Sequence, residues 1–170
     1  MSSRVPWQER TIEEAHLFNP AFIGALCFEY VKANSRASEI GHVEIPTVFC
    51  ALPLALHRET RKSLPSRTTT SVYTWLQREP RVQVGYSRRA KDLAPAVREG
   101  IIYAQARNAL TFDEAGNLSI GLQRASFTNS FLQNVTSEMR EIVIATRFLG
   151  RWFATAGSTT TLLAAWRITV

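Results

Sequence analysis

The sequence predicts a mainly α-helical protein with one small β-hairpin, an α+β fold whose winged-helix-like central region packs against N- and C-terminal helices. Apolar residues recur at three- and four-residue spacing over residues 22–31 and 128–156, as on the buried face of a helix. Two short alternating stretches flank an Asp, Gly and Asn turn within residues 110–120. A length of 170 residues with 45% apolar residues suits a single compact domain over residues 1–170, although two small lobes would also fit.

The N-terminal part predicts two helices followed by a loop. Thr11 and Glu14 have the spacing of a capping box at the start of a short helix. Asn19 is expected to cap the second helix, because the proline after it is tolerated in a first turn. The polar composition of residues 34–44 then predicts a loop.

Residues 45–64 predict a buried helix whose charged C-terminal end reaches the surface. Pro53 lies inside this pattern and is expected to be able to break or kink the helix. A short helix over residues 68–77 and a short strand over residues 82–84 follow.

The segment before the hairpin predicts two further helices. Ser87 can cap one that runs to about Leu93, and Pro95 suits the first turn of another that continues to Ala106. With the hairpin, residues 68–121 then show three short helices followed by two strands, which is the element order of a winged helix.

The last third predicts a long helix from Thr128 to Ala156, ended by Gly157, and a final short helix capped by Ser158. These C-terminal helices span residues 128–168. The apolar surroundings of the two cysteines predict buried reduced thiols, and three tryptophans on apolar faces predict core positions. These residues are Cys27, Cys50, Trp75, Trp152 and Trp166.

The net charge of +6 is concentrated in the middle of the chain. Residues 53–107 contribute +7, whereas residues 1–52 contribute −2 and residues 108–170 contribute +1. This concentration suits a surface that faces phosphates or an acidic partner, and the alternative is a plain solvated surface rich in arginine. The candidate contact residues are Arg58, Arg61, Lys62, Arg67, Arg88, Arg89, Lys91 and Arg98.

Catalytic, metal-binding and membrane-spanning motifs do not occur in the sequence. The histidines His16, His42 and His57 are far apart, and there is no phosphate loop or paired Cys-x-x-Cys spacing. We therefore expect no catalytic site, metal, cofactor or small-molecule substrate, and an enzyme with a dispersed site is the weakest alternative. The absence of a long apolar run and of a signal peptide predicts a cytoplasmic protein that does not contact membranes.

Trp7 differs from the other tryptophans because it precedes the first predicted helix in a polar arm. It is expected either to insert into a protein partner or to fold back on its own domain.

Five stretches of the chain form a recognisable pattern: Pro6-Trp7-Gln8-Glu9-Arg10-Thr11-Ile12-Glu13-Glu14-Ala15, Leu17-Phe18-Asn19-Pro20-Ala21-Phe22, Leu52-Pro53-Leu54-Ala55-Leu56-His57-Arg58-Glu59-Thr60-Arg61, Thr74-Trp75-Leu76-Gln77 and Arg147-Phe148-Leu149-Gly150-Arg151-Trp152-Phe153. In these stretches the chain resembles the bacterial family called the middle component of three-component ABC systems.

The resemblance implies a small subunit without catalysis of its own, encoded between an ABC ATPase of the chromosome-maintenance type and a larger effector. Such systems are thought to guard bacteria against invading DNA from phages and plasmids. The resemblance makes the chain an adaptor between ATPase and effector, with double-stranded DNA as a further candidate partner. The alternative is a stand-alone winged-helix regulator that binds DNA, which the few cations in residues 95–108 weaken.

Overall fold

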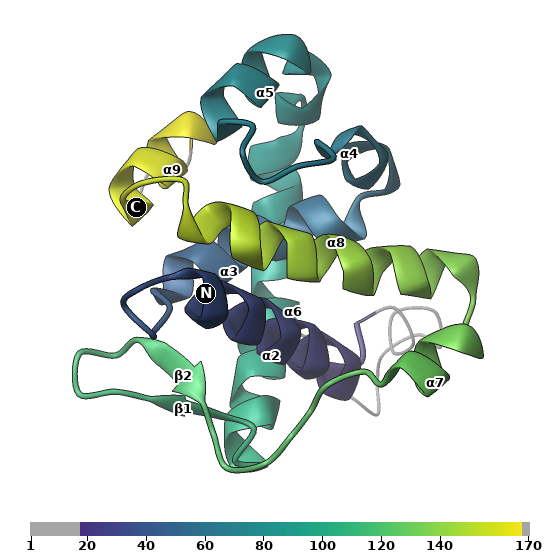
Figure 1. Cartoon of the computed structure of the whole chain (residues 1–170), viewed down its shortest axis with the longest axis vertical. Helices are drawn as coiled ribbons and strands as arrows, with labels where there is room; N and C mark the ends of the chain where they lie inside the picture. Colours follow the sequence, from purple (N-terminus) through teal and green to yellow (C-terminus); the bar gives the residue numbers. More distant parts are fainter. Residues whose placement is uncertain (1–17, 168–170) are drawn as a thin grey trace.

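The computed structural model describes residues 18–167, and this part of the chain is mainly helical with one two-stranded antiparallel sheet (Figure 1). The mainly helical prediction with a hairpin is therefore confirmed. In chain order the elements are α2 (Pro20–Ala37), α3 (Ile45–Leu56), α4 (Arg58–Ser63), α5 (Val72–Arg78), the 3-10 helix η2 (Pro80–Gln83), α6 (Tyr86–Ala106), β1 (Leu110–Phe112), β2 (Leu118–Ile120), α7 (Asn129–Gln133), α8 (Ser137–Ala154) and α9 (Thr159–Ala165).

Helix α2 is the central element of the fold. It begins as predicted, because the Asn19 side chain accepts a hydrogen bond of 2.8 Å from the Ala21 N–H and proline follows the cap. It packs against α6, which crosses it, and against α8, which runs beside it (Figure 1). At the α6 crossing a Cβ on Gly24 would lie 2.7 Å from the Gly100 carbonyl oxygen, so both helices need glycine there.

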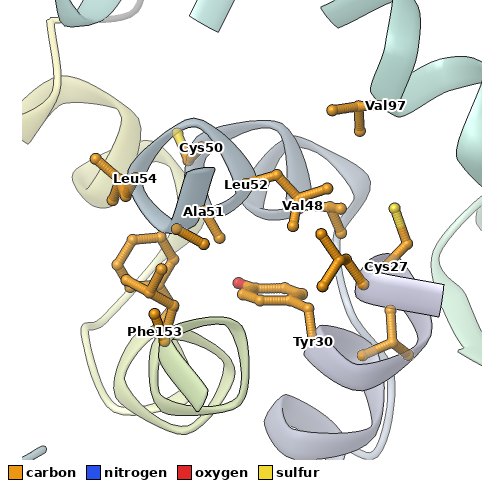
Figure 2. Packing of buried hydrophobic residues seen from close by; sticks show 14 of the residues in the cluster. Cys27, Tyr30, Val48, Cys50, Ala51, Leu52, Leu54, Val97 and Phe153 are labelled. Atoms are coloured by element: carbon orange, nitrogen blue, oxygen red, sulfur yellow. The ribbon is translucent and has the colours of Figure 1, made fainter. Parts of the chain in front are cut away.

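The core forms where α2, α3 and α8 meet. Tyr30 of α2 points between Ala51 and Leu52 of α3 and Phe153 of α8 (Figure 2), and its ring meets the Phe153 ring edge-on at 6.4 Å. The core positions predicted for the three tryptophans are confirmed, since each is at most 3% exposed. Both cysteines are buried and free, as predicted.

The helix predicted over residues 45–64 is divided into α3 and α4, and the division lies at His57, four residues beyond Pro53. Pro53 removes only its own N–H from the helical ladder, and α3 continues past it to Leu56. His57 adopts an extended backbone, and its Nδ1 accepts a hydrogen bond from the Thr60 N–H at 3.3 Å to cap α4. Helix α2 also extends to Ala37, into the predicted loop.

Two predictions before the hairpin are wrong. Residues 82–84 follow Pro80 through a 3-10 turn and have no strand partner, so they form no strand. The two helices predicted around Ser87 and Pro95 are one 21-residue helix, α6. It begins after Gly85, whose φ of +67° favours glycine. Pro95 removes one hydrogen bond, but the packing of α6 against α2 and α3 keeps the helix continuous.

The long helix predicted over residues 128–156 is also divided, into α7 and α8. Thr128 caps α7 and Thr136 caps α8, each through a side-chain oxygen that accepts a hydrogen bond from an N–H three residues on. The predicted end is confirmed: Gly157 follows α8 with a φ of +93°, and the Ser158 hydroxyl caps α9.

The predicted hairpin is confirmed, and Leu110 pairs with Ile120 while Phe112 pairs with Leu118. A single bridge from Leu118 to Val43 joins the hairpin to the segment after α2. The order of three short helices predicted within residues 68–121 is wrong, because this interval holds α5, a 3-10 turn and one long helix. The winged-helix arrangement is therefore not confirmed.

Candidate anion-binding surfaces

The basic residues predicted in the middle of the chain lie mainly at one end of the molecule, where α4, η2 and the start of α6 meet (Figure 1). Six of them are exposed, and we call this set the α4–α6 surface. Arg98 lies roughly 10 Å along the α6 axis from Lys91. The set comprises Arg58, Lys62, Arg67, Arg88, Lys91 and Arg98.

The other two predicted contact residues are used inside the chain. The Arg61 side chain is 3% exposed and donates hydrogen bonds to the Ala55 carbonyl at 2.9 Å and to Glu138 at 3.2 Å. Arg89 is half-buried and donates to the carbonyls of Val82 and Val84. Arg61 is therefore a structural residue and not the surface contact that we predicted, because its guanidinium is enclosed by partners of its own chain.

An apolar residue accompanies the charges of the α4–α6 surface. Val84, between η2 and α6, is 73% exposed and directly precedes the segment that carries Arg88. Arg88 lies 3.8 Å from Asp92 in an ion pair that is exposed on both sides. The surface therefore combines cations with an exposed aliphatic side chain, a mixture that suits a protein partner.

A second basic region, which the sequence analysis missed, is a groove of about 510 Å³ over α2. We call it the α2/α8 groove, because residues of α2, of α8 and of the segment that follows β2 line it. Helix α2 lies between the other two (Figure 1). Five cations and a single carboxylate line it, which leaves a surplus of four positive charges. They are Lys32, Arg36, Arg124, Arg147, Arg151 and Glu29.

The carboxylate of the α2/α8 groove, Glu29, bonds to both of the other segments that line the groove. Glu29 is 2% exposed and accepts two hydrogen bonds of 2.8 Å from Arg147 of α8. It also accepts a hydrogen bond of 2.7 Å from the Phe127 N–H. Arg147 in turn donates to the Phe127 carbonyl at 2.8 Å, and its pKa is raised, first by the hydrogen bonds to Glu29. One buried ion pair thus joins α2, α8 and the connecting segment.

The remaining four cations surround this neutral pair. Lys32 donates to the Ser126 hydroxyl at 2.7 Å. Burial lowers the pKa of Lys32, and the positive charges of Arg36, Arg124 and Arg147 lower it further against the opposing effect of Glu29. Arg36, Arg124 and Arg151 are exposed, and no carboxylate in residues 18–167 forms an ion pair with them.

The α2/α8 groove continues into a neighbouring hollow of about 460 Å³ that shares Lys32, Arg36 and Arg124. Phe127 also lines the groove, and its ring stacks at 5.5 Å on Phe131, which is 43% exposed and does not itself line the groove. The region is therefore an open trough lined by cations, with an exposed aromatic ring stacked on one of its lining residues.

The sequence contains one signal that could have indicated the α2/α8 groove. Lys32 and Arg36 are four residues apart on α2, and Arg147 and Arg151 have the same spacing on α8, so each pair lies on one helix face. The net charge of each third of the chain did not reveal these pairs, because the groove brings together residues more than 100 positions apart in the sequence.

Both cysteines are buried in the core. Burial raises the pKa of Cys50 to about 11 and raises that of Cys27 further, so both thiols stay protonated. Within residues 18–167, no three His, Cys, Asp or Glu side chains are grouped closely enough to hold a metal ion. In the same range no helix is long and apolar enough to cross a membrane. Trp7 lies outside the described residues.

Comparisons with known proteins identify the family. The model of the family described as ABC-three component (ABC-3C) system Middle Component 3 matches residues 7–170, nearly the whole chain, and the chain belongs to this family. A search of curated proteins and a search of solved structures both found no match.

Proposed function

From membership of this family we propose that the chain is a non-catalytic adaptor, which links an ABC ATPase of the chromosome-maintenance type to an effector subunit. The complex would act in the bacterial cytoplasm against invading phage or plasmid DNA. The observation that carries the proposal is the match to a Middle Component over residues 7–170, since the family description places the protein within a system of three components.

The α4–α6 surface supports a protein-binding role. Val84, between η2 and α6, is 73% exposed and precedes Arg88 and Lys91 on α6, and arginine is enriched at protein interfaces. We assign this surface to an acidic face of one of the other two components. Arg61 is excluded from the contact, and Trp7 is a further candidate for the same interface.

The chemistry-bearing side chains also fit a role without catalysis. Both cysteines are buried, and the Tyr86 hydroxyl donates to the Cys50 carbonyl at 2.8 Å within the core. His57 is used as a helix cap. Their positions are explained by packing and capping.

The adaptor role is tested by co-expressing the full chain with the products of its two neighbouring genes and purifying through a tag on this chain. We expect both components to co-purify with it. Co-purification of neither would refute the adaptor role.

The contact surface is tested with a triple variant, Arg58→Gln, Arg88→Gln and Lys91→Gln, which lowers the formal net charge from +6 to +3. We expect at least about a tenfold loss of affinity for one component, because several charge contacts disappear together. The matched control is Arg36→Gln, Arg124→Gln and Arg151→Gln, which removes the same charge from the α2/α8 groove. Equal losses in both variants would argue against a specific contact.

The alternative, a stand-alone winged-helix regulator, has weaker support. Residues 95–106 form the second half of α6, whose Val97, Gly100 and Ile101 are buried, and the cations within residues 95–108 are Arg98 and Arg107. Selection of duplex DNA by mobility shift with the isolated chain tests it. Enrichment of a two-fold symmetric site would favour the regulator over the adaptor.

A further inference from the structure

We propose that the α2/α8 groove is a binding site for a single strand of nucleic acid, with backbone phosphates on Arg36, Arg124 and Arg151 and a base on Phe131. This inference concerns a ligand that the adaptor role does not require. It rests on the side chains that line the groove and on Phe131, which stacks on the lining residue Phe127.

The charges of the groove favour a ligand with repeated negative charges. Its one carboxylate, Glu29, is neutralised by Arg147, and no carboxylate in the described residues forms an ion pair with the other four cations that line the trough. Like charges gathered around a partly buried lysine repel one another. A phosphate backbone relieves this repulsion and releases its own counterions as it binds.

The shape of the groove favours a single strand over a duplex. The trough is recessed over α2 and continues into the neighbouring hollow through Lys32, Arg36 and Arg124. A flexible strand can follow such a depression, whereas a duplex presents a wide convex cylinder. Proteins that bind single strands commonly combine a basic groove with aromatic rings on which bases stack.

The aromatic ring distinguishes nucleic acid from an acidic peptide. Phe131 is 43% exposed and stacks on Phe127, whose ring is held at the groove and packs against Phe22 at 6.0 Å. A peptide of acidic residues alone would use the cations only, whereas a nucleotide offers both a phosphate and a flat base. The combination of a supported ring with cations that form no ion pair within residues 18–167 therefore points to nucleotides.

The experiment measures fluorescence anisotropy of a labelled single strand of about 12 nucleotides with the full chain, over a range of salt concentrations. The groove variant Arg36→Gln, Arg124→Gln, Arg151→Gln is compared with the α4–α6 variant Arg58→Gln, Arg88→Gln, Lys91→Gln, which has the same net charge. Thermal unfolding checks that both variants fold.

We expect the groove variant to bind at least about tenfold more weakly at low salt and its salt slope to fall by roughly 2, from three lost phosphate contacts. The α4–α6 variant should bind within about threefold of the original chain. Equal binding by all three proteins, or equal loss in both variants, would overturn the proposal.

Phe131→Ala provides a second test that leaves every charge in place. Loss of base stacking should weaken single-strand binding by about fivefold or more while the salt slope is unchanged. Unchanged affinity would contradict the assignment of a base to this ring.

Two competitor ligands complete the test. A duplex of the same sequence and a poly-glutamate peptide should each compete at least about tenfold less effectively than the unlabelled single strand. Stronger competition by the duplex would contradict the single-strand site. Equal or stronger competition by the peptide would show that the groove takes an acidic protein segment instead. Because only the purified chain is used, failure here is distinguishable from failure of the adaptor role, which depends on co-purification.

Discussion

An ion pair with one buried member lies beside each of the two basic regions, and the buried member is the carboxylate at the α2/α8 groove but the arginine at the α4–α6 surface. Below the groove the carboxylate is enclosed: Glu29 has a side chain 3% exposed, and its partner Arg147 is 26% exposed. Beside the α4–α6 surface the arginine is enclosed: Arg61 is 3% exposed, whereas Glu138 and Glu141 are 63% and 47% exposed. The buried member of each pair has a structural role. The exposure of its partners predicts how much its substitution lowers the free energy of unfolding.

The largest effect is expected from Glu29→Gln. The change removes the negative charge that Arg147 requires while it preserves side-chain shape, and it leaves a partly buried guanidinium without a counter-ion. We expect the free energy of unfolding to fall by about 3 kcal/mol, measured by urea denaturation. The control is Glu39→Gln, the same chemical change at an exposed position, which should stay within about 0.5 kcal/mol of the original chain. Equal effects of the two would show that the buried pair does not support the groove.

The next effect is expected from Gly150→Ala at the contact of α8 with α2. An added Cβ would lie 2.6 Å from the Tyr30 carbonyl oxygen and 2.8 Å from the Ala33 Cβ, so the helices must move apart. Overpacking of this kind costs about 1–3 kcal/mol, more than alanine gains in helix propensity. Thermal unfolding measures the change, and an unchanged or higher melting temperature would contradict this close approach.

A smaller effect is expected from Arg61→Met. The Ala55 carbonyl loses a buried donor, but both glutamates are exposed enough to be hydrated once the guanidinium is removed. We expect a loss of about 1–2 kcal/mol in urea denaturation, less than for Glu29→Gln. Lys62→Met at the neighbouring exposed position is the control and should change stability by less than about 0.5 kcal/mol. A larger loss for Arg61→Met than for Glu29→Gln would reverse the comparison.

The smallest effect is expected from the titration of His57, next to the α4–α6 surface. Burial lowers its pKa from the usual 6.5, and the charges of Arg89 and Arg61 lower it further despite Glu59. The unfolded chain then binds the proton more readily, so stability is lost as pH falls below 6.5.

His57→Asn tests this pH dependence, because asparagine can cap α4 without titrating. The fall in melting temperature between about pH 7.5 and about pH 5.5 should be smaller in the variant than in the original chain. An identical pH dependence would show that the ring does not contribute to it.

Local signals in the sequence predicted the elements that depend on neighbouring residues. Asn19 and Ser158 cap their helices as expected, and the Asp, Gly and Asn turn forms the hairpin, since each feature is decided within a few positions. The errors arose where tertiary packing overrides local propensity. Pro95 lies within a continuous helix because α6 packs on α2. Pro53 does not end α3, and the helix predicted over residues 45–64 is instead divided at His57.

The candidate sites show the same limit. The sequence indicated the cations of the α4–α6 surface, because they all come from one basic stretch of the chain, residues 53–107. It could not show that Arg61 is enclosed, since its partners Glu138 and Glu141 are distant in sequence. It missed the α2/α8 groove because Arg36, Arg124 and Arg151 come together only when the chain folds.

Hydrogen–deuterium exchange of the full chain tests most directly whether the two basic regions have different ligands. We predict that a single-stranded oligonucleotide protects the segment over residues 121–128, beside the α2/α8 groove, and that the other two components protect residues 79–88 of the α4–α6 surface. Protection of the same segment by both ligands would contradict the account.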